Sequence, residues 1–225
     1  MSRQDENATA STKVTSFITK NRILFIGALI CFCVALVGFI VVSKITEASK
    51  DKSLSRIEEI SFTLTDGSSA LSEGELEARR LDALDSLASL NTKGGIVGAR
   101  ANMLSAEISF QLKKYEDAAK YWSNVAKKAR SNYLYPLAMY NLGVAYEQLG
   151  KTSEASESYK AAYENKNCLF ACHAGFSYGR TLEALGKYAE AVEIYQKIND
   201  AEPGEAWSML AKTRIIALKA EKKVE

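Results

Sequence analysis

Two cysteines and the only histidine of the chain, Cys168, Cys172 and His173, form the one cluster whose residue types could support a reaction. Their order resembles the haem-attachment motif C-x-x-C-H, but three residues rather than two separate these cysteines. No second axial ligand is evident apart from a distant methionine such as Met103. A structural metal site needs about four ligands, which this cluster does not supply. We therefore expect no cofactor and no metal, with haem attachment as the residual alternative.

The same cysteines allow a structural interpretation. A disulfide between Cys168 and Cys172 would form in an oxidising compartment if their Cα atoms lay within about 7 Å of each other across a turn. We favour the alternative that both are small thiols packed at a tight turn between helices. Cys31 and Cys33 lie in a long apolar run, where cysteine serves as a small apolar residue.

No other motif indicates catalysis. Gly94-Gly95 followed by Gly98 lies between two expected helices rather than after a strand, so it indicates a turn and not a phosphate-binding loop. Adjacent carboxylates, such as Glu58-Glu59 and Glu116-Asp117, are typical of solvated helix faces. We therefore expect that the protein is not an enzyme and takes no small-molecule substrate.

The charge distribution argues against nucleic acid as the partner. Residues 43–225 carry 25 basic and 25 acidic side chains, so the formal excess of +2 lies entirely in residues 1–22. A protein that binds DNA or RNA presents a basic stripe to the phosphate backbone. A neutral domain without such a stripe favours proteins as partners.

The run from Ile23 to Val42 contains no charged residue and no proline. A helix of this length spans roughly 30 Å, the hydrocarbon thickness of a bilayer. We interpret it as an uncleaved transmembrane anchor, residues 23–42. A cleaved signal peptide, with Thr46-x-Ala48 as its processing site, is an alternative, although its apolar region is usually about 7–15 residues long. A buried core helix is the third option, which we disfavour because the remaining chain offers no all-apolar surroundings.

The charges that flank the anchor bear on its orientation in the membrane. The residues before it and the 20 residues after it each carry four positive charges, so the positive-inside count is tied. Lys20 and Arg22 directly adjoin the apolar run, and a domain of this size can be translocated regardless of local charge. We expect a cytoplasmic N-terminal tail, residues 1–22, and a domain on the other side of the membrane.

The second half of the chain repeats itself. Small and aromatic residues return after 36 positions: Leu142, Gly143, Gly150, Ala155 and Tyr159 correspond to Tyr178, Gly179, Gly186, Ala191 and Tyr195. A period near 34 with small residues at fixed places is typical of a solenoid of helix pairs. Both prolines, Pro136 and Pro203, fall between pairs, where the missing N–H costs little. The sequence predicts an all-α, right-handed α-solenoid with pairs at about 99–132, 136–169 and 172–203 and a capping helix at 205–222.

Two segments precede these pairs. Residues 43–72 are expected to form a juxtamembrane helical linker that is broken at Asp66-Gly67. A helix from Glu73 to about Leu90 follows, with Leu81, Leu84 and Leu87 on one face.

The repeated residues resemble the tetratricopeptide repeat (TPR). The second pair supplies Leu142, Gly143, Tyr146, Ala155, Tyr159 and Ala162, and the third supplies Gly179, Leu182, Ala191, Tyr195 and Pro203. The first pair is weaker, with Ala106, Ala118 and Trp122. Ala83, Leu87 and Leu90 fit a lone second helix one period earlier. The resemblance covers roughly residues 75–222, and we assign the TPR domain to residues 73–222.

The resemblance implies a concave groove lined by the first helix of each pair. Met103 and Glu107 stand where some family members carry a Lys and an Asn that grip a C-terminal carboxylate, so that clamp is not expected. The implied groove is apolar and aromatic and suits an apolar or amphipathic polypeptide segment. Packing between helices is the alternative role for about half of its aromatic residues. The partner-binding residues that the resemblance implies are Met103, Phe110, Tyr140, Val144, Phe176 and Arg180.

The layout of tail, anchor and repeat domain is similar to that of the YfgM-type ancillary subunit of the Sec translocon. This resemblance implies a single-pass protein of the bacterial inner membrane whose periplasmic TPR domain is an adaptor or scaffold for other proteins. Its partners would be the translocon, envelope chaperones or nascent envelope proteins, with chaperone-like assistance at the translocon. Alternatives are a structural organiser that docks one resident envelope or division protein, and an adaptor that faces the cytoplasm.

Overall fold

The computed structural model describes residues 15–17, 19–130 and 132–224, so most of the expected N-terminal tail lies outside the described residues. The chain divides into two compact units, Met1–Lys52 and Ser53–Glu225. Helix α2 (Arg22–Thr65) contributes to both units. Each unit is described by itself.

The first unit contains the apolar part of α2. The most apolar 18-residue window of this helix has a mean hydropathy of 3.0, and none of that window is buried. Length and composition are therefore sufficient for a membrane span. A signal sequence near the N-terminus meets the same criteria, so the finding supports an anchor or a signal without distinguishing them.

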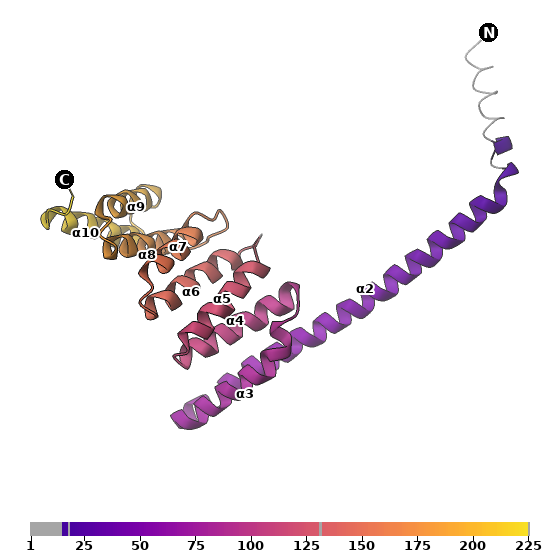
Figure 1. Ribbon diagram of the computed structural model, residues 1–225, viewed down its shortest axis with the longest axis horizontal. Helices are drawn as coiled ribbons and strands as arrows, with labels where there is room; N and C mark the ends of the chain where they lie inside the picture. Colours follow the sequence, from indigo (N-terminus) through magenta and orange to yellow (C-terminus); the bar gives the residue numbers. More distant parts are fainter. Residues whose placement is uncertain (1–14, 18, 131, 225) are drawn as a thin grey trace, which may run out of the picture. The chain divides into compact units, whose positions relative to one another are not determined.

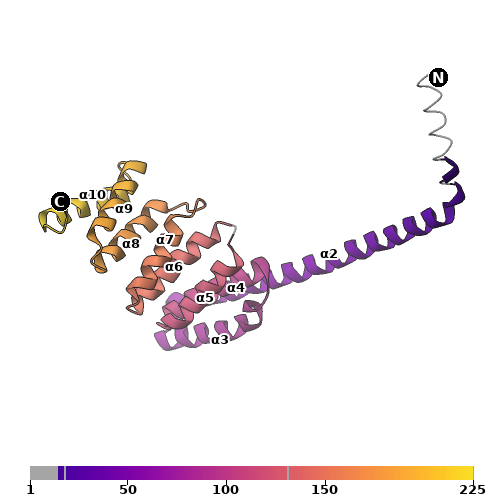
Figure 2. The ribbon, with the colours of Figure 1, turned by 45° about the horizontal axis from the view of Figure 1, so that its top comes forward.

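The second unit is a stack of antiparallel helices, each packed against the next (Figures 1 and 2). No strand occurs among the described residues. The expected helices agree with the observed ones to within a few residues. After the end of α2 the elements are η1 (Ser68–Ala70), α3 (Glu73–Asn91), α4 (Gly95–Gln111), α5 (Tyr115–Lys128), α6 (Leu134–Gln148), α7 (Thr152–Tyr163), α8 (Ala171–Ala184), α9 (Tyr188–Ala201) and α10 (Ala206–Ala220).

Glycine and tyrosine fit together at the centre of each of the last two pairs. A Cβ atom added to Gly143 on α6 would lie 2.8 Å from the ring of Tyr159 on α7. A Cβ atom added to Gly179 on α8 would lie even closer to the ring of Tyr195 on α9. Both tyrosines are almost fully buried, at 1% and 0% exposure. The repeated small and aromatic residues therefore set the close approach of the two helices in each pair.

The turns between paired helices fix the register of the repeats. Lys113, Gly150 and Gly186 all have a positive φ, at 59°, 68° and 75°. They occupy the same place after α4, α6 and α8, where the chain needs the left-handed conformation that glycine adopts most readily. Because these three residues are equivalent, a position in one pair can be matched to the other pairs by counting residues from the positive-φ residue.

The stack begins earlier than the sequence indicated. We assigned residues 43–72 to a linker and α3 to an unpaired helix, but Ile57 and Ile60 of α2 are 3% and 5% exposed. They share a core cluster with Leu87 of α3 and Ile108 of α4. The C-terminal end of α2 therefore pairs with α3. On α3 itself, Leu81 was expected on the packed face but is 41% exposed.

Side-chain contacts close this first pair. Arg79 donates through Nη1 to the carbonyl oxygens of Thr63 and Asp66, at 2.9 and 2.6 Å. These carbonyls lie at the end of α2, where the helix has no further N–H groups to satisfy them. Ser72 caps α3 in a capping box with Glu75.

Candidate polypeptide-binding surface

The predicted groove residues lie on α4, α6 and α8, the first helices of the three pairs that the sequence indicated. We call the surface that these residues form the A-helix surface. Arg180 is exposed, and each of the others is partly exposed. Phe110 and Val144 line one cavity together, whereas Tyr140 and Phe176 lie in a separate aromatic cluster.

The aromatic cluster packs α6, α8 and α10 together. The Tyr140 hydroxyl is 2.7 Å from Nε2 of His173, whose ring stacks on Trp207 at 3.9 Å between centroids. Phe176 lies 5.5 Å from the same Trp207 ring. Burial lowers the pKa of His173. These aromatic residues are therefore largely engaged with one another.

The two cysteines beside this cluster, Cys168 and Cys172, are not bonded to each other in this structure. Cys172 is buried, with the Ser208 hydroxyl 3.9 Å from its Sγ, and Cys168 is partly buried. Burial raises the pKa of both thiols. The disulfide between them stays a prediction. Among the described residues, no group of three or more His, Cys, Asp or Glu side chains is arranged to hold a metal ion.

A hydrogen-bonded network that sequence reasoning missed joins each of the last two pairs to the helix that follows. Glu147 on α6 accepts from the Tyr159 hydroxyl at 2.6 Å and from Arg180 of α8 at 2.7 Å. One repeat later, Glu183 on α8 accepts from the Tyr195 hydroxyl and from Arg214 of α10. We call this arrangement the Glu–Tyr–Arg network. Its only sequence signal is the 36-residue spacing of the two glutamates and the two tyrosines.

The network keeps its carboxylates ionised. Burial acts to raise the pKa of Glu147, but the hydrogen bonds from Arg180 and Tyr159 outweigh it, so the pKa is lowered. The same balance, with Arg214 and Tyr195, lowers the pKa of Glu183. Burial, together with the glutamate, raises the pKa of each tyrosine, so both hydroxyls remain donors.

The network is absent between α4 and α6. Register places Phe110 where Glu147 and Glu183 stand, since each lies three residues before the positive-φ turn residue. Trp122 takes the place of Tyr159, and Val144 takes the place of Arg180. A cavity of about 220 Å³ lies at this interface, and we call it the groove pocket. Its lining residues are Glu107, Phe110, Gln111, Trp122, Asn141 and Val144.

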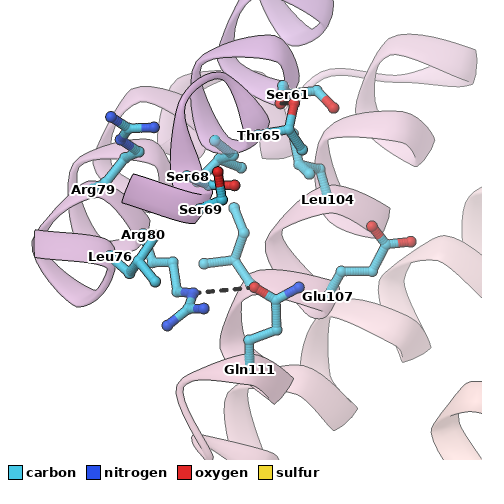
Figure 3. Close-up of a pocket in the computed structure, with 12 residues that line it drawn as sticks. Ser61, Thr65, Ser68, Ser69, Leu76, Arg79, Arg80, Leu104, Glu107 and Gln111 are labelled. Carbon is cyan, nitrogen blue, oxygen red and sulfur yellow. Dashed lines mark hydrogen bonds between the residues drawn. The ribbon is translucent and has the colours of Figure 1, made fainter. Parts of the chain in front are cut away.

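A second, more polar cavity of about 360 Å³ adjoins it and is bounded by the end of α2, η1, α3 and α4. We call it the polar pocket; its lining includes Glu107 and Gln111, which both cavities share. Arg80 donates through Nε to Oε1 of Gln111 at 3.1 Å and pairs with Glu73 at 3.0 Å. Figure 3 shows the Glu107 carboxylate on the opposite side of Gln111 from Arg80.

Glu107 differs from the other glutamates of this surface. It has no hydrogen bond or ion pair to any other described residue, and burial of its carboxyl raises its pKa. The sequence placed Glu107 on the inner face of the first predicted pair, as a residue that does not suit a carboxylate clamp. Its position between two cavities was not predictable without the fold.

Comparison with known proteins agrees with this architecture. The fold defines the class, an all-α stack of antiparallel helix pairs. Models of the tetratricopeptide repeat match residues 110–167 and 176–205, so these two segments of the chain contain tetratricopeptide repeats. The pair formed by α2 and α3 lies outside the matched residues. Proteins with TPR scaffolds are generally non-enzymatic.

The chain is also similar to a TPR repeat-containing protein of Treponema pallidum (strain Nichols). The two are 30% identical over 138 residues, which are 61% of this chain and 58% of that relative. The chain therefore matches less than two thirds of the length of this curated relative.

Among solved structures, the chain resembles YrrB, a TPR protein with an unusual peptide-binding site. The TM-score is 0.52 at 18% identity, over 81% of this chain and 84% of YrrB. It also resembles MamA, with a TM-score of 0.46 at 24% identity, over 59% of this chain and 72% of MamA. At these identities the YrrB match supports the fold alone. Neither resemblance names a translocon subunit.

Proposed function

We propose that the protein is a membrane-anchored TPR adaptor that binds polypeptide segments of other proteins along its A-helix surface. The observation that carries this proposal is the groove pocket, a cavity between α4, α5 and α6 that is lined by three apolar side chains, two amides and the carboxylate of Glu107. Such a combination suits a polypeptide segment with apolar and polar side chains. YrrB, which has the same fold, is described as having a peptide-binding site.

The cellular setting is the finer part of the proposal. The apolar part of α2 would hold the adaptor in the bacterial inner membrane with its TPR unit in the periplasm, where it would assist proteins that emerge from the Sec translocon. Support comes from the length and composition of α2 and from the neutral charge of residues 43–225. An organiser of one envelope or division protein, and a cytoplasm-facing adaptor, are the alternatives.

Site-specific crosslinking in intact cells tests the adaptor function. A photoreactive residue at Val144, on the groove pocket, is expected to capture a polypeptide partner that mass spectrometry identifies. The matched control is Glu157, an exposed residue on α7, which belongs to the other set of helices. Equal capture from both positions, or none from Val144, would contradict the proposal. Translocon or nascent-chain products favour the translocon role, and one constant partner favours the organiser.

A reporter fused after Glu225 tests the orientation. Alkaline phosphatase is active only outside the cytoplasm, so we expect activity from that fusion. Activity of a cytoplasmic reporter at the same position would overturn the periplasmic placement and leave the cytoplasm-facing adaptor.

A further inference from the structure

The α4–α6 interface differs from the two later interfaces at all three positions that form the Glu–Tyr–Arg network. At the α6–α8 and α8–α10 interfaces a glutamate, a tyrosine and an arginine bind one another. At the α4–α6 interface the matching residues are Phe110, Trp122 and Val144. Removing one member alone would leave a partly buried charge without its partner, which is costly. Replacing all three avoids that cost.

The replacement also creates space. Val144 is much shorter than the arginine that spans the next interface, and the groove pocket lies where that side chain would otherwise run. Its volume of about 220 Å³ is smaller than the usual range of small-molecule sites, about 300–1,000 Å³. Apolar rings from Phe110 and Trp122 form part of its wall. A single large apolar side chain fits both the size and the lining of such a cavity.

The charge at the rim of this pocket is the second observation. Glu107 lies at the position that Val144 takes on α6 and Arg180 takes on α8. Arg180 pairs with Glu147 of the preceding inner helix, α6. The residue of α2 that corresponds to Glu147 is Leu64, which lies three residues before the positive-φ residue Gly67. Arg80, a basic residue of the adjoining polar pocket, is already bound to Gln111 and Glu73. The described residues therefore provide no cation for Glu107.

We infer that the groove pocket takes one large apolar side chain of a partner polypeptide and that Glu107 binds a neighbouring lysine or arginine of the same segment. The inference rests on the proposed adaptor function and names the chemistry of its partner. The polar pocket gives the cation a path to Glu107, because the aliphatic stem of a lysine or arginine can lie along Leu64 and Leu104, which line this pocket. On α6 and α8, the glutamates Glu147 and Glu183 are already paired with arginines of this chain, so they are not free to bind a cation of the partner.

Peptide binding to the purified full-length protein in detergent tests this inference. The probes are fluorescein-labelled peptides that combine one phenylalanine with a neighbouring lysine, and matched peptides in which that lysine is glutamine or the phenylalanine is serine. We expect the wild-type protein to prefer the phenylalanine–lysine peptide in fluorescence anisotropy. Glu107→Gln should weaken binding of that peptide by roughly threefold to tenfold and leave the glutamine peptide unchanged.

A second variant separates the pocket from the charge. The triple change Phe110→Glu, Trp122→Tyr and Val144→Arg would copy the Glu–Tyr–Arg network into the α4–α6 interface and close the pocket. We expect it to lose the preference for phenylalanine over serine while its circular dichroism stays helical. If the triple variant does not fold, Val144→Met, which narrows the pocket without a charge, gives the same readout.

The outcomes distinguish this inference from the adaptor function. Binding that neither Glu107→Gln nor pocket closure alters would overturn the inference, while capture from Val144 in cells would still support an adaptor. No peptide preference in the wild-type protein would also overturn it. Self-association that Glu107→Gln abolishes would identify a second copy as the occupant and reject a separate partner.

Discussion

At the scale of single residues, the carboxylates of this surface fall into two kinds. Glu147 and Glu183 are each bound by a tyrosine hydroxyl and an arginine, and their pKa values are lowered. Glu107 has no such partner, and burial raises its pKa. A lowered pKa means that folding stabilises the charged form, and a raised pKa means that folding disfavours it. The two kinds should therefore respond oppositely to neutralisation and to acid.

The first prediction compares Glu147→Gln with Glu107→Gln. At neutral pH, Glu147→Gln should lower the midpoint of thermal unfolding, whereas Glu107→Gln should raise it only slightly, because the Glu107 side chain is exposed to solvent. The Glu147 carboxylate stabilises the fold above its unfolded pKa of about 4.5, and this contribution disappears as the pH falls through the lower folded value. The penalty at Glu107 is full above its raised folded pKa and is relieved as the pH falls below about 4.5. The difference in unfolding midpoint between each variant and the wild type should therefore become smaller in acid. Equal effects of the same sign from the two variants would refute the division of these glutamates into two kinds.

The second prediction concerns the tyrosine of the network. Tyr159→Phe removes a hydroxyl that donates to the carboxylate of Glu147 in a nearly closed site, so we expect a loss of about 1–3 kcal/mol in the free energy of unfolding. Tyr163→Phe is the matched control on the same helix, since no described residue binds its hydroxyl. Urea unfolding followed by circular dichroism measures both. Equal losses would mean that packing, not the hydrogen bond, accounts for the effect of Tyr159.

These networks illustrate what the sequence could not reveal. Glu147, Tyr159 and Arg180 come from three successive helices, and their meeting depends on how those helices pack. Periodicity identified Tyr159 as a packed aromatic residue but gave no reason to join it to a glutamate. The groove pocket can be recognised only when the residues of the α4–α6 interface are compared with those of the later interfaces, which requires the register of the repeats.

At the scale of elements, the sequence predicted α4 to α10 closely because each pair carries small residues where helices touch and a left-handed residue at the turn. The first pair was missed because it lacks these marks. Its first helix is the end of α2, where Ile60 stands in the place of the usual small residue, and its turn is lengthened by η1. Apolar spacing predicted a helix there but did not show that it belonged to the stack.

The third prediction tests this added pair. Ile57→Ala should cost about 2–5 kcal/mol, because Ile57 is 3% exposed in the core between α2, α3 and α4. Phe62→Ala, on the same helix but 66% exposed, should change stability by less than about 0.5 kcal/mol. Urea unfolding of the full-length variants in detergent gives both values. Similar small effects would mean that this part of α2 is a linker, as first expected.

At the scale of the whole molecule, the apolar part of α2 decides where the protein resides. No residue of the most apolar window of this helix is buried, so the described residues do not shield this window from water. Exposure of that much apolar surface is costly in water and favourable in lipid. We therefore expect the helix to reside in a membrane as an anchor.

The fourth prediction follows from that expectation. The full-length protein should remain with the membrane pellet after an alkaline carbonate wash and enter solution only with detergent. Its intact mass should include residues 1–48, which signal cleavage would remove. A carbonate-soluble product whose mass corresponds to a chain that begins just after Ala48 would instead establish signal cleavage.

The division of the chain between Lys52 and Ser53 bears on that alternative. The small-x-small site at Ala48 lies before this division, and the first core residues of the stack come after it. A peptidase acting there would release a product with its helical stack intact and both cavities preserved. If the protein is the anchored adaptor proposed above, its anchor and its binding surface lie in separate stretches of sequence, and the released form would keep the same ligand preference.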